Sequence, residues 1–327
     1  MSIVAGISLI DGVMLAADSR VTYQRRGMPD VHLDCAQKIY PISENSAVGF
    51  VGSIEVASVL LRTMFHHLSH RRRREAPSLA NWLPRFFRWT YQRYWPQGRT
   101  DQFAIMVASV VKNRPNVVAR EELVRITNQI AFGPSSTERG WIPDILVRAL
   151  QSDPSYSKIR FQGTSMGRLY VLRSPKFHME LVPPLKFAAI GSGSGAEKMI
   201  AGYHDMIVAG EPGNAFIESM SLRNAINDFL ADTEIGSVGG LLPIARLTGS
   251  GVEALGYGFE MPQDGVEIKL TFDARTSRWI QRNCVSGKEM RLLHPWEIPD
   301  SRSEHDVFDD FIDAFRRFRG EAEDSGS

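Results

Sequence analysis

Two apolar segments joined by an Asp-Gly pair open the chain, and they place the strongest constraint on its fold. The stretch SIVAGISLI precedes Asp11-Gly12, and VMLAADSRVT follows it. An Asp-Gly pair between two runs of β-favouring residues is typical of a tight hairpin turn. The sequence therefore predicts two antiparallel strands at the start of the fold. A secretory leader is not expected, because Asp11, Asp18 and Arg20 interrupt the apolar stretch.

Strands and helices alternate in the rest of the pattern. A second hairpin is predicted for KIYPISENSAVGFVG. Two helices are predicted next, for SIEVASVLLRTMFHHLSH and for SLANWLPRFFRWTYQRYW, and the second should be kinked at Pro84. FAIMVASVV and RLYVLRS are expected strands, and FHMELV and LKFAAIG lead to the glycine-rich GSGSG. Two helices, AEKMIAGYHDMIVAG and GNAFIESMSLRNAINDFLAD, precede the strands LLPIARLTG and GVEALGYGF. This order predicts sheets packed between layers of helices.

Two parts of the chain fall outside this order. Residues from about 112 to 163 separate strands that would otherwise be neighbours, and their charges and prolines indicate an insertion with some helix. Residues 264–327 are expected to form a C-terminal extension that ends in an amphipathic helix, VFDDFIDAFRRF, and a disordered tail, EAEDSGS. One large domain would then occupy residues 1–263 around the insertion.

Composition excludes several classes of protein. The 327 residues are 43% hydrophobic and 23% charged, which is the make-up of a globular chain with a large core. A formal net charge of +1 gives no overall field that would attract nucleic acid or an anionic membrane. No apolar run is long enough to cross a bilayer, and two cysteines, Cys35 and Cys284, make no disulfide framework. We therefore expect a soluble cytoplasmic protein that binds neither nucleic acid nor membranes.

Ser2 is a candidate nucleophile. Removal of Met1, which a small second residue permits, would leave a serine with both a hydroxyl and a free α-amine. Such an amine has an unperturbed pKa of about 8, so it can accept a proton near neutral pH. One residue could then supply the nucleophile and its base. Position alone is weak support, since most serines that follow an initiator methionine are inert.

Five motifs raise this expectation, because their combination is more specific than any one of them. They are SIVAG, DGVMLAADSRVT, KIYPI, VGFVGS and AIGSGS. Asp18 follows Ser2 by sixteen positions, and Gly52 follows Lys38 by fourteen. Together these features resemble the proteasome family of N-terminal-nucleophile hydrolases, which includes proteasome β-subunits and the bacterial peptidase HslV. The resemblance implies an α+β fold, a four-layer αββα sandwich, to which the insertion and the C-terminal extension are added.

The resemblance also implies a role for each matching residue. Ser2 would attack an amide, and a buried Lys38 would lower the proton affinity of the amine and hydroxyl beside it. Asp18 would pair with Lys38, because burying either charge alone is costly. The Gly52 NH would bind the oxyanion, and Ser192 would hydrogen-bond the α-amine. No metal or cofactor is required by this chemistry.

Substrate and partners follow from the same resemblance. Thr22 corresponds to a position whose main chain lines a bound peptide as an added strand. Peptide or protein substrates are therefore implied, together with self-association into a ring or larger particle and an ATP-dependent unfolding partner. The insertion and the extension exceed the compact form of the family, so they could cap a pocket or alter assembly. The segment from Asp18 to Lys38, expected to be a surface loop, is also longer than usual.

The sequence departs from the family in its later part. The family has an aspartate and, three residues on, a serine, whereas Ile235 and Val238 stand at the matching places. Three polar residues nearby are candidates to replace them: Asp232, Glu234 and Ser237.

The amino terminus allows a second alignment. Ile3-Val4 would fit the family better with Met1 in the nucleophile's place. Ser2 is preferred, because methionine offers no nucleophile and the interval to Asp18 is kept.

Other interpretations stay open. GSGSG between a strand and a helix could bind a phosphate, as in a dinucleotide site, although the expected acidic residue is missing. HHLSH could offer two imidazoles to a metal, but no third ligand is evident. RRRRE, with Trp82, Trp89 and Tyr91 nearby, could contact nucleic acid or an acidic partner. The non-enzymatic alternative is an inactive structural member of the same family that assembles with partners.

Overall fold

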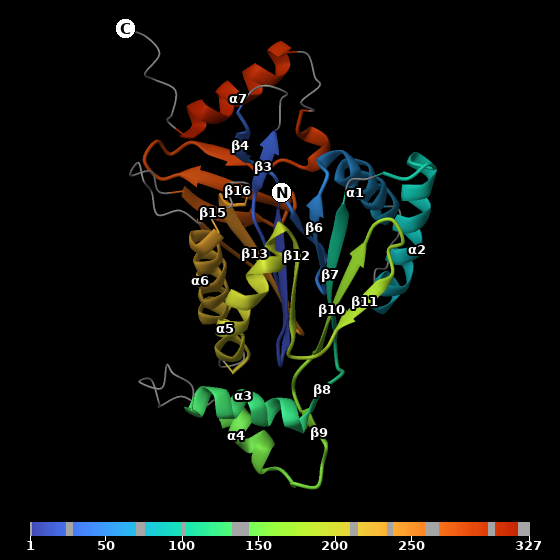
Figure 1. The fold of residues 1–327 in the computed structure, drawn as a ribbon, viewed down its shortest axis with the longest axis vertical. Helices are drawn as coiled ribbons and strands as arrows, with labels where there is room; N and C mark the ends of the chain where they lie inside the picture. Colours follow the sequence, from blue (N-terminus) through green and yellow to red (C-terminus); the bar gives the residue numbers. More distant parts are fainter. Residues whose placement is uncertain are drawn as a thin grey trace.

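The computed structural model of the chain describes residues 2–23, 29–69, 76–99, 102–132, 144–209, 215–233, 238–258, 268–299 and 305–319. Within these ranges the fold is a mixed α+β structure with antiparallel sheets and seven α-helices (Figure 1). The predicted α+β class is confirmed. None of the helices in these ranges combines the length and hydrophobicity that a membrane span requires.

The first five-stranded sheet contains the amino-terminal hairpin. Its strand order is β12-β1-β2-β13-β14. The strands are β1 (Ile3–Ser8), β2 (Gly12–Ala17), β12 (Phe187–Gly191), β13 (Leu241–Thr248) and β14 (Gly251–Gly258). β1 and β2 pair from Val4↔Ala17 to Ser8↔Val13, so the Asp-Gly pair lies at the hairpin turn as predicted. β1 also pairs with β12, which places Gly191 opposite Ile3.

The second five-stranded sheet contains the second predicted hairpin. Its order is β11-β10-β7-β6-β5. The strands are β5 (Ile39–Ser43), β6 (Ser46–Gly52), β7 (Phe103–Val111), β10 (Met166–Arg173) and β11 (Met179–Val182). The two sheets pack face to face, because Val4 and Leu15 of the first share a buried cluster with Met106 and Ala108 of the second.

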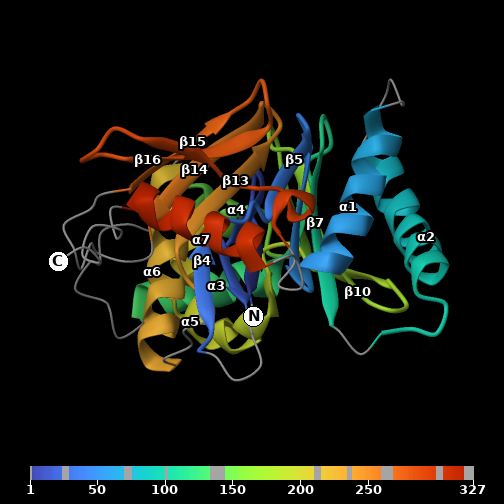
Figure 2. The same cartoon turned by 90° about the horizontal axis from the view of Figure 1, so that it is seen from above.

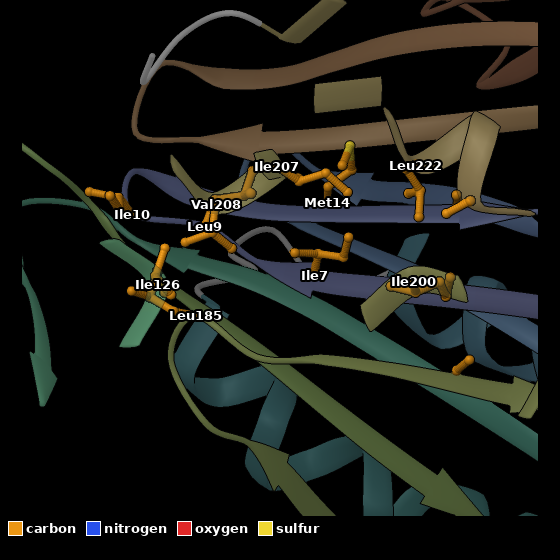
Figure 3. Close-up of a cluster of buried hydrophobic side chains, with 14 of the residues drawn as sticks. Ile7, Leu9, Ile10, Met14, Ile126, Leu185, Ile200, Ile207, Val208 and Leu222 are labelled. Carbon is orange, nitrogen blue, oxygen red and sulfur yellow. The ribbon is translucent and has the colours of Figure 1, made fainter. Parts of the chain in front are cut away.

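Helices cover the outer face of each sheet. α5 (Glu197–Ala209) and α6 (Ala215–Thr233) lie on the first sheet, where Ile200 and Leu222 join Ile7 and Met14 in one buried cluster (Figure 3). α1 (Ile54–Ser69) and α2 (Ala76–Tyr94) lie on the second sheet. Figure 2 shows the two helical pairs on opposite sides of the sheets.

The described parts of residues 112–163 form a small subdomain at one end of the first sheet. β8 (Asn116–Ala119) pairs with β9 (Lys158–Phe161), and α3 (Arg120–Phe132) and α4 (Asp144–Gln151) lie between them in sequence. In Figure 1 these elements lie below α5 and α6. Leu123 and Ile126 enter the cluster that also contains Ile7, so the subdomain packs directly on the core.

The carboxy-terminal part adds a three-stranded sheet and a helix. β15 (Ile268–Asp273), β16 (Arg278–Asn283) and β17 (Glu289–Arg291) are followed by a short 3-10 helix, η3 (Pro295–Glu297), and by α7 (His305–Arg319). α7 is the amphipathic helix predicted from the sequence. The disorder predicted for residues 321–327 concerns a segment outside the described residues.

A ribbon of two short strands lies beneath α7. β3 (Arg20–Tyr23) pairs with β4 (Val31–Asp34), and Figure 1 shows α7 above both. The interpretation of the segment between Asp18 and Lys38 as a surface loop is therefore wrong for its two ends. Phe308 and Phe315 of α7 pack with Val21 and Leu33 of the ribbon, because both elements present apolar side chains to one another.

Candidate active site

Ser2 lies immediately before β1 and is held through its main chain. The carbonyl oxygen of Ser2 accepts a hydrogen bond of 2.9 Å from the Ser192 NH, and the Ile3 carbonyl accepts one of 3.2 Å from the Asp18 NH. Only 8% of Ser2 is exposed. The pairing of β1 with its neighbours thus fixes the residue at the end of the first sheet.

Lys38 lies between Ser2 and Asp18 and contacts both. Its ammonium nitrogen, Nζ, lies 2.8 Å from Ser2 Oγ and 3.0 Å from both carboxylate oxygens of Asp18. The carbonyl oxygen of Arg20 accepts a further hydrogen bond from Nζ. Lys38 is 1% exposed and Asp18 is 0% exposed. The structure therefore brings together three residues that are far apart in the sequence.

Asp18 is held in place by the main chain on both sides of the site. It directly follows β2, and its Oδ1 accepts a hydrogen bond of 2.9 Å from the Ile3 NH. Its Oδ2 accepts a hydrogen bond of 3.3 Å from the Arg20 NH. A buried carboxylate needs such partners, because an unpaired one would be strongly destabilising.

Burial governs the ionisation of this pair. Desolvation lowers the pKa of Lys38 from its ordinary value, and the neighbouring Asp18 carboxylate opposes the effect. Desolvation raises the pKa of Asp18, again against the attraction of Lys38. Lys38 is consequently a better proton donor to its surroundings than an exposed lysine would be.

The geometry also bears on the alignment at the amino terminus. Ser2 Oγ lies within hydrogen-bond distance of Lys38 Nζ. Met1 lies outside the described residues. The contact favours the alignment with Ser2 in the nucleophile's place.

Gly52 ends β6 in a conformation that favours glycine. Its φ is +108°, and an added Cβ would lie 2.1 Å from the Gln102 carbonyl oxygen. A side chain at this position would therefore require both an unfavourable backbone and a displaced strand. Gly52 lines the same pocket as Ser2.

Ser192 contacts Ser2 through its main chain. Gly191, which precedes it, has a φ of +84°, and a Cβ there would lie 2.1 Å from the Ser2 carbonyl oxygen. This close approach allows the Ser192 NH to reach Ser2. The GSGSG segment thus packs on the candidate nucleophile, and Ser192 lies at the start of a 3-10 helix, η2 (Ser192–Ala196). The predicted role of its side chain beside the α-amine stays a prediction.

A pocket of about 1220 Å³ opens over Ser2. Thr22 lines it together with the rest of β3, and Thr22 Oγ1 lies 3.0 Å from His32 Nδ1 of β4. The other walls come from the end of β6, the start of α1, the start of β7 and the segment that joins β12 to η2. Ser2, Gly52, Ser192 and Thr22 therefore line one cavity, and Lys38 contacts it through Ser2.

The C-terminal extension supplies a wall that the sequence did not assign to the site. The lining residues from this part are Pro295, Trp296, Ile298 and Pro299. η3 packs against α1, and Trp296 is partly buried beside Phe65, with ring centroids 6.1 Å apart. No local motif could have revealed this wall, because its position depends on the path of the three-stranded sheet.

The remaining sequence candidates have different outcomes. Glu234 and Ser237 lie outside the described residues, and Asp232 falls within α6 at a place where side chains are not described. The RRRRE run and His70 also lie outside these residues. His66 and His67 neighbour each other on α1, but the described part of the chain contains no cluster of three or more potential metal ligands.

Comparisons with known proteins concern the family and the fold of the chain. The family profile described as proteasome subunit matches residues 2–119. The fold is similar to a solved structure titled "Helical Assembly of the Anbu Complex from Pseudomonas aeruginosa", with a TM-score of 0.50, 12% sequence identity and coverage of 80% of this chain and 88% of that chain. At this identity the likeness concerns the fold alone. A comparison with curated protein sequences found no match. The match to this profile makes residues 2–119 of the chain similar to proteasome subunits.

Proposed function

We propose that the protein is an N-terminal-nucleophile hydrolase that cleaves amide bonds with Ser2, after Met1 has been removed. The observation that carries the proposal is the 2.8 Å contact between Ser2 Oγ and the buried Lys38 Nζ at a large pocket. A hydroxyl needs a base and a positive electrostatic environment to attack an amide near neutral pH. The free α-amine of Ser2 would supply the base, and Lys38 supplies the environment.

The reaction follows from these positions. The α-amine takes the proton of Ser2 Oγ as the oxygen attacks the carbonyl carbon of the substrate. The Gly52 NH stabilises the negative charge on the carbonyl oxygen of the tetrahedral intermediate. The amine then returns the proton to the departing amine of the substrate, which leaves an ester on Ser2. Water hydrolyses this ester by the same route and regenerates the free serine.

Lys38 and Asp18 set the charge balance of the site. Lys38 donates to Ser2 Oγ, so its ammonium stabilises the oxygen as that atom loses its proton. Asp18 holds Lys38 in place and balances its charge in the buried site. Ser192 would support the α-amine through a hydrogen bond.

Extended peptides are the substrates that fit the pocket best. Its volume of about 1220 Å³ exceeds the roughly 300–1000 Å³ that is usual for small-molecule sites. β3 lines the pocket with four consecutive residues, Arg20–Tyr23. A peptide could therefore align with the main chain at Thr22 as an added strand.

The finer statements about fold and assembly belong to the same proposal. The order of helices, sheet, sheet and helices supports a four-layer αββα sandwich of the N-terminal-nucleophile type. The similar Anbu structure is described as a helical assembly, which supports self-association of this chain into a ring or larger particle. A cytoplasmic location, an ATP-dependent unfolding partner and the absence of nucleic-acid or membrane binding stay predictions.

An intact-mass spectrum before and after treatment with a peptide β-lactone tests the proposal. We expect loss of Met1 and a single adduct that maps to Ser2. The Ser2→Ala variant should take up no adduct and hydrolyse no peptide amide, and Lys38→Met should react at least 100-fold more slowly, in the range of acid–base effects. A retained Met1, or equal labelling of Ser2→Ala, would contradict the mechanism and favour an inactive structural subunit.

A further inference from the structure

The last residue of α7 reaches the ribbon that borders the candidate active site. Arg319 Nη2 lies 2.9 Å from Asp34 Oδ2. Asp34 is 2% exposed, whereas Arg319 is 24% exposed. The Arg319 guanidinium also lies 5.7 Å from the centre of the Phe315 ring, which orients it along the helix. A surface helix thus supplies a charge partner to a buried carboxylate.

The same carboxylate holds the side chain of Arg20. Arg20 Nε donates to Asp34 Oδ1 at 2.7 Å, and Arg20 Nη2 donates to Asp34 Oδ2 at 3.2 Å. This is the two-bond geometry in which arginine binds a carboxylate most strongly. Asp34 therefore joins Arg20 of β3 to Arg319 of α7.

The main chain of Arg20 touches both charged residues of the candidate site. Its NH donates to Asp18 Oδ2, and its carbonyl oxygen accepts a hydrogen bond from Lys38 Nζ. A displacement of Arg20 would consequently move the partners of Asp18 and Lys38 together. Ser2 Oγ would be affected through its contact with Lys38.

Two glycines lie close against the ion pair of Arg20 and Asp34. An added Cβ at Gly240 would lie 2.3 Å from Asp34 Cγ, and one at Gly239 would lie 2.8 Å from Arg20 Cζ. The Leu241 NH donates to Ser19 Oγ at 2.8 Å, which fixes this segment against the turn between β2 and β3. The ion pair has little room to reorient on this side.

Apolar contacts anchor α7 to the same ribbon. Phe308 and Phe315 join Val21 and Leu33 in a buried cluster. The Tyr23 and Phe308 rings lie edge to face, with centroids 4.7 Å apart. Arg319 is therefore presented to Asp34 from a helix that is itself fixed.

We propose that Arg319 is a positioning residue of the candidate active site: it fixes Asp34, and through Asp34 it fixes Arg20, whose main chain orients Lys38 and Asp18. The inference rests on the proposed function. It assigns the C-terminal helix, which lies outside the part of the chain matched to the family, a role in the chemistry at Ser2. Small misplacements of reacting groups reduce rates strongly, so a loosened Arg20 should slow the acylation of Ser2.

The test compares Arg319→Ala with Arg316→Ala. Both variants remove one arginine from the last turn of α7, but Arg316 is exposed and lies outside the pocket lining. We expect Arg319→Ala to lower kcat for a peptide amide roughly tenfold with little change in KM, and to slow β-lactone acylation of Ser2 equally. Arg316→Ala should react like the unsubstituted protein. Arg319→Lys should recover part of the rate, because it keeps the charge but not the planar fork.

The pH profile separates positioning from a loss of stability. Desolvation lowers the pKa of Lys38, and the carboxylates of Asp18 and Asp34 oppose this effect. Without Arg319, the charge of Asp34 is less compensated and favours the protonated forms of Lys38 and the α-amine. The acidic limb of kcat/KM should therefore move to higher pH in Arg319→Ala and stay in place in Arg316→Ala. A global loss of stability would lower the amplitude without moving the limb.

Coupling to Asp34 completes the test. In an Asp34→Asn background, Arg319→Ala should have no further effect on the acylation rate, since the link is already broken. Equal kcat, acylation rate and pH limb for Arg319→Ala and Arg316→Ala would overturn the inference while leaving the proposed function intact. Failure of the unsubstituted protein to acylate at Ser2 would instead overturn the proposed function, and the inference with it.

Discussion

At the scale of single residues, the candidate site depends on a buried ammonium group that donates hydrogen bonds to several partners. Lys38 donates to Ser2 Oγ, to Asp18 and to the Arg20 carbonyl, so its charge has partners on several sides. Cys35, three positions earlier, is also buried, and desolvation raises the pKa of its thiol to about 12. The thiol therefore stays neutral near physiological pH, and Lys38 is the charged side chain that this part of the chain presents to Ser2.

Substitution of Gly52 tests the oxyanion position. Gly52→Ala should abolish most amide hydrolysis and destabilise the protein by more than 1 kcal/mol, because alanine meets both a positive φ and the Gln102 carbonyl oxygen. Gly98→Ala is the matched control: Gly98 has a φ of +76°, but an added Cβ meets nothing within 4 Å. It should lose about 1 kcal/mol and keep its activity. Denaturant unfolding and peptide hydrolysis should be measured on both variants. Equal losses of stability and of activity in the two variants would refute the prediction.

At the scale of elements, the extension contributes an apolar wall to a pocket whose charges are paired. Arg20 is paired with Asp34, and Arg99 with Glu55 at 2.8 Å. Trp296 lies on the opposing element, η3, with its ring 4.3 Å from that of His294. The pocket should therefore select substrates by the shape and hydrophobicity of a side chain more than by its charge.

Removal of the indole tests this selection. Trp296→Ala should raise KM roughly tenfold for peptides with a large apolar side chain at the cleaved residue, and should change KM little for peptides with alanine there, since the lost contact serves only the large side chain. Trp89→Ala removes an exposed tryptophan from α2, outside the pocket lining, and should leave both values unchanged. An equal rise of KM for both kinds of peptide would refute an apolar subsite at this wall.

The elements also show how far the sequence alone could lead. Both hairpins were predictable, because their turns and strands are encoded within about ten residues of one another, as at Asp11-Gly12. Ser2, Asp18 and Lys38 were predictable as a set through the resemblance to the family, which also implied the pairing of Asp18 with Lys38. The β3–β4 ribbon and the wall at Trp296 were not predictable, because packing under α7 and the path of the three-stranded sheet decide them.

At the scale of the whole molecule, charge networks join the insertion to the main layers. Arg125 of α3 binds Asp205 of α5 at 2.9 Å and Glu122 of its own helix at 2.9 Å. Lys186, just before β12, binds Glu122 at 2.7 Å, and His204 Nδ1 lies 2.9 Å from Asp205 Oδ1. The subdomain of residues 112–163 is thus bound to the layer that leads, through β12, to Gly191 and the site.

Because of this network, the stability of the molecule should depend on pH. Burial alone would raise the pKa of Asp205, but hydrogen bonds from His204 and Arg125 hold it below its ordinary value. The pKa of Glu122 is likewise lowered, because hydrogen bonds from Arg125 and Lys186 outweigh desolvation. A carboxyl with a lower pKa in the folded state stabilises the protein above its unfolded pKa of about 4, and this stabilisation is lost as the pH falls through the folded value.

Asp205→Asn should therefore lower the free energy of unfolding by about 1–2 kcal/mol at pH 7, a value kept small because Arg125 is 43% exposed and screened by solvent. The difference from the unsubstituted protein should shrink as the pH falls below about 4, since acid removes the same charge from Asp205. Asp313→Asn removes an exposed carboxylate from α7 and should show neither effect. Urea unfolding from pH 7 to pH 3 measures this difference. A difference in the free energy of unfolding that stayed constant over that range would show that packing, and not the ion pair, joins α3 to α5.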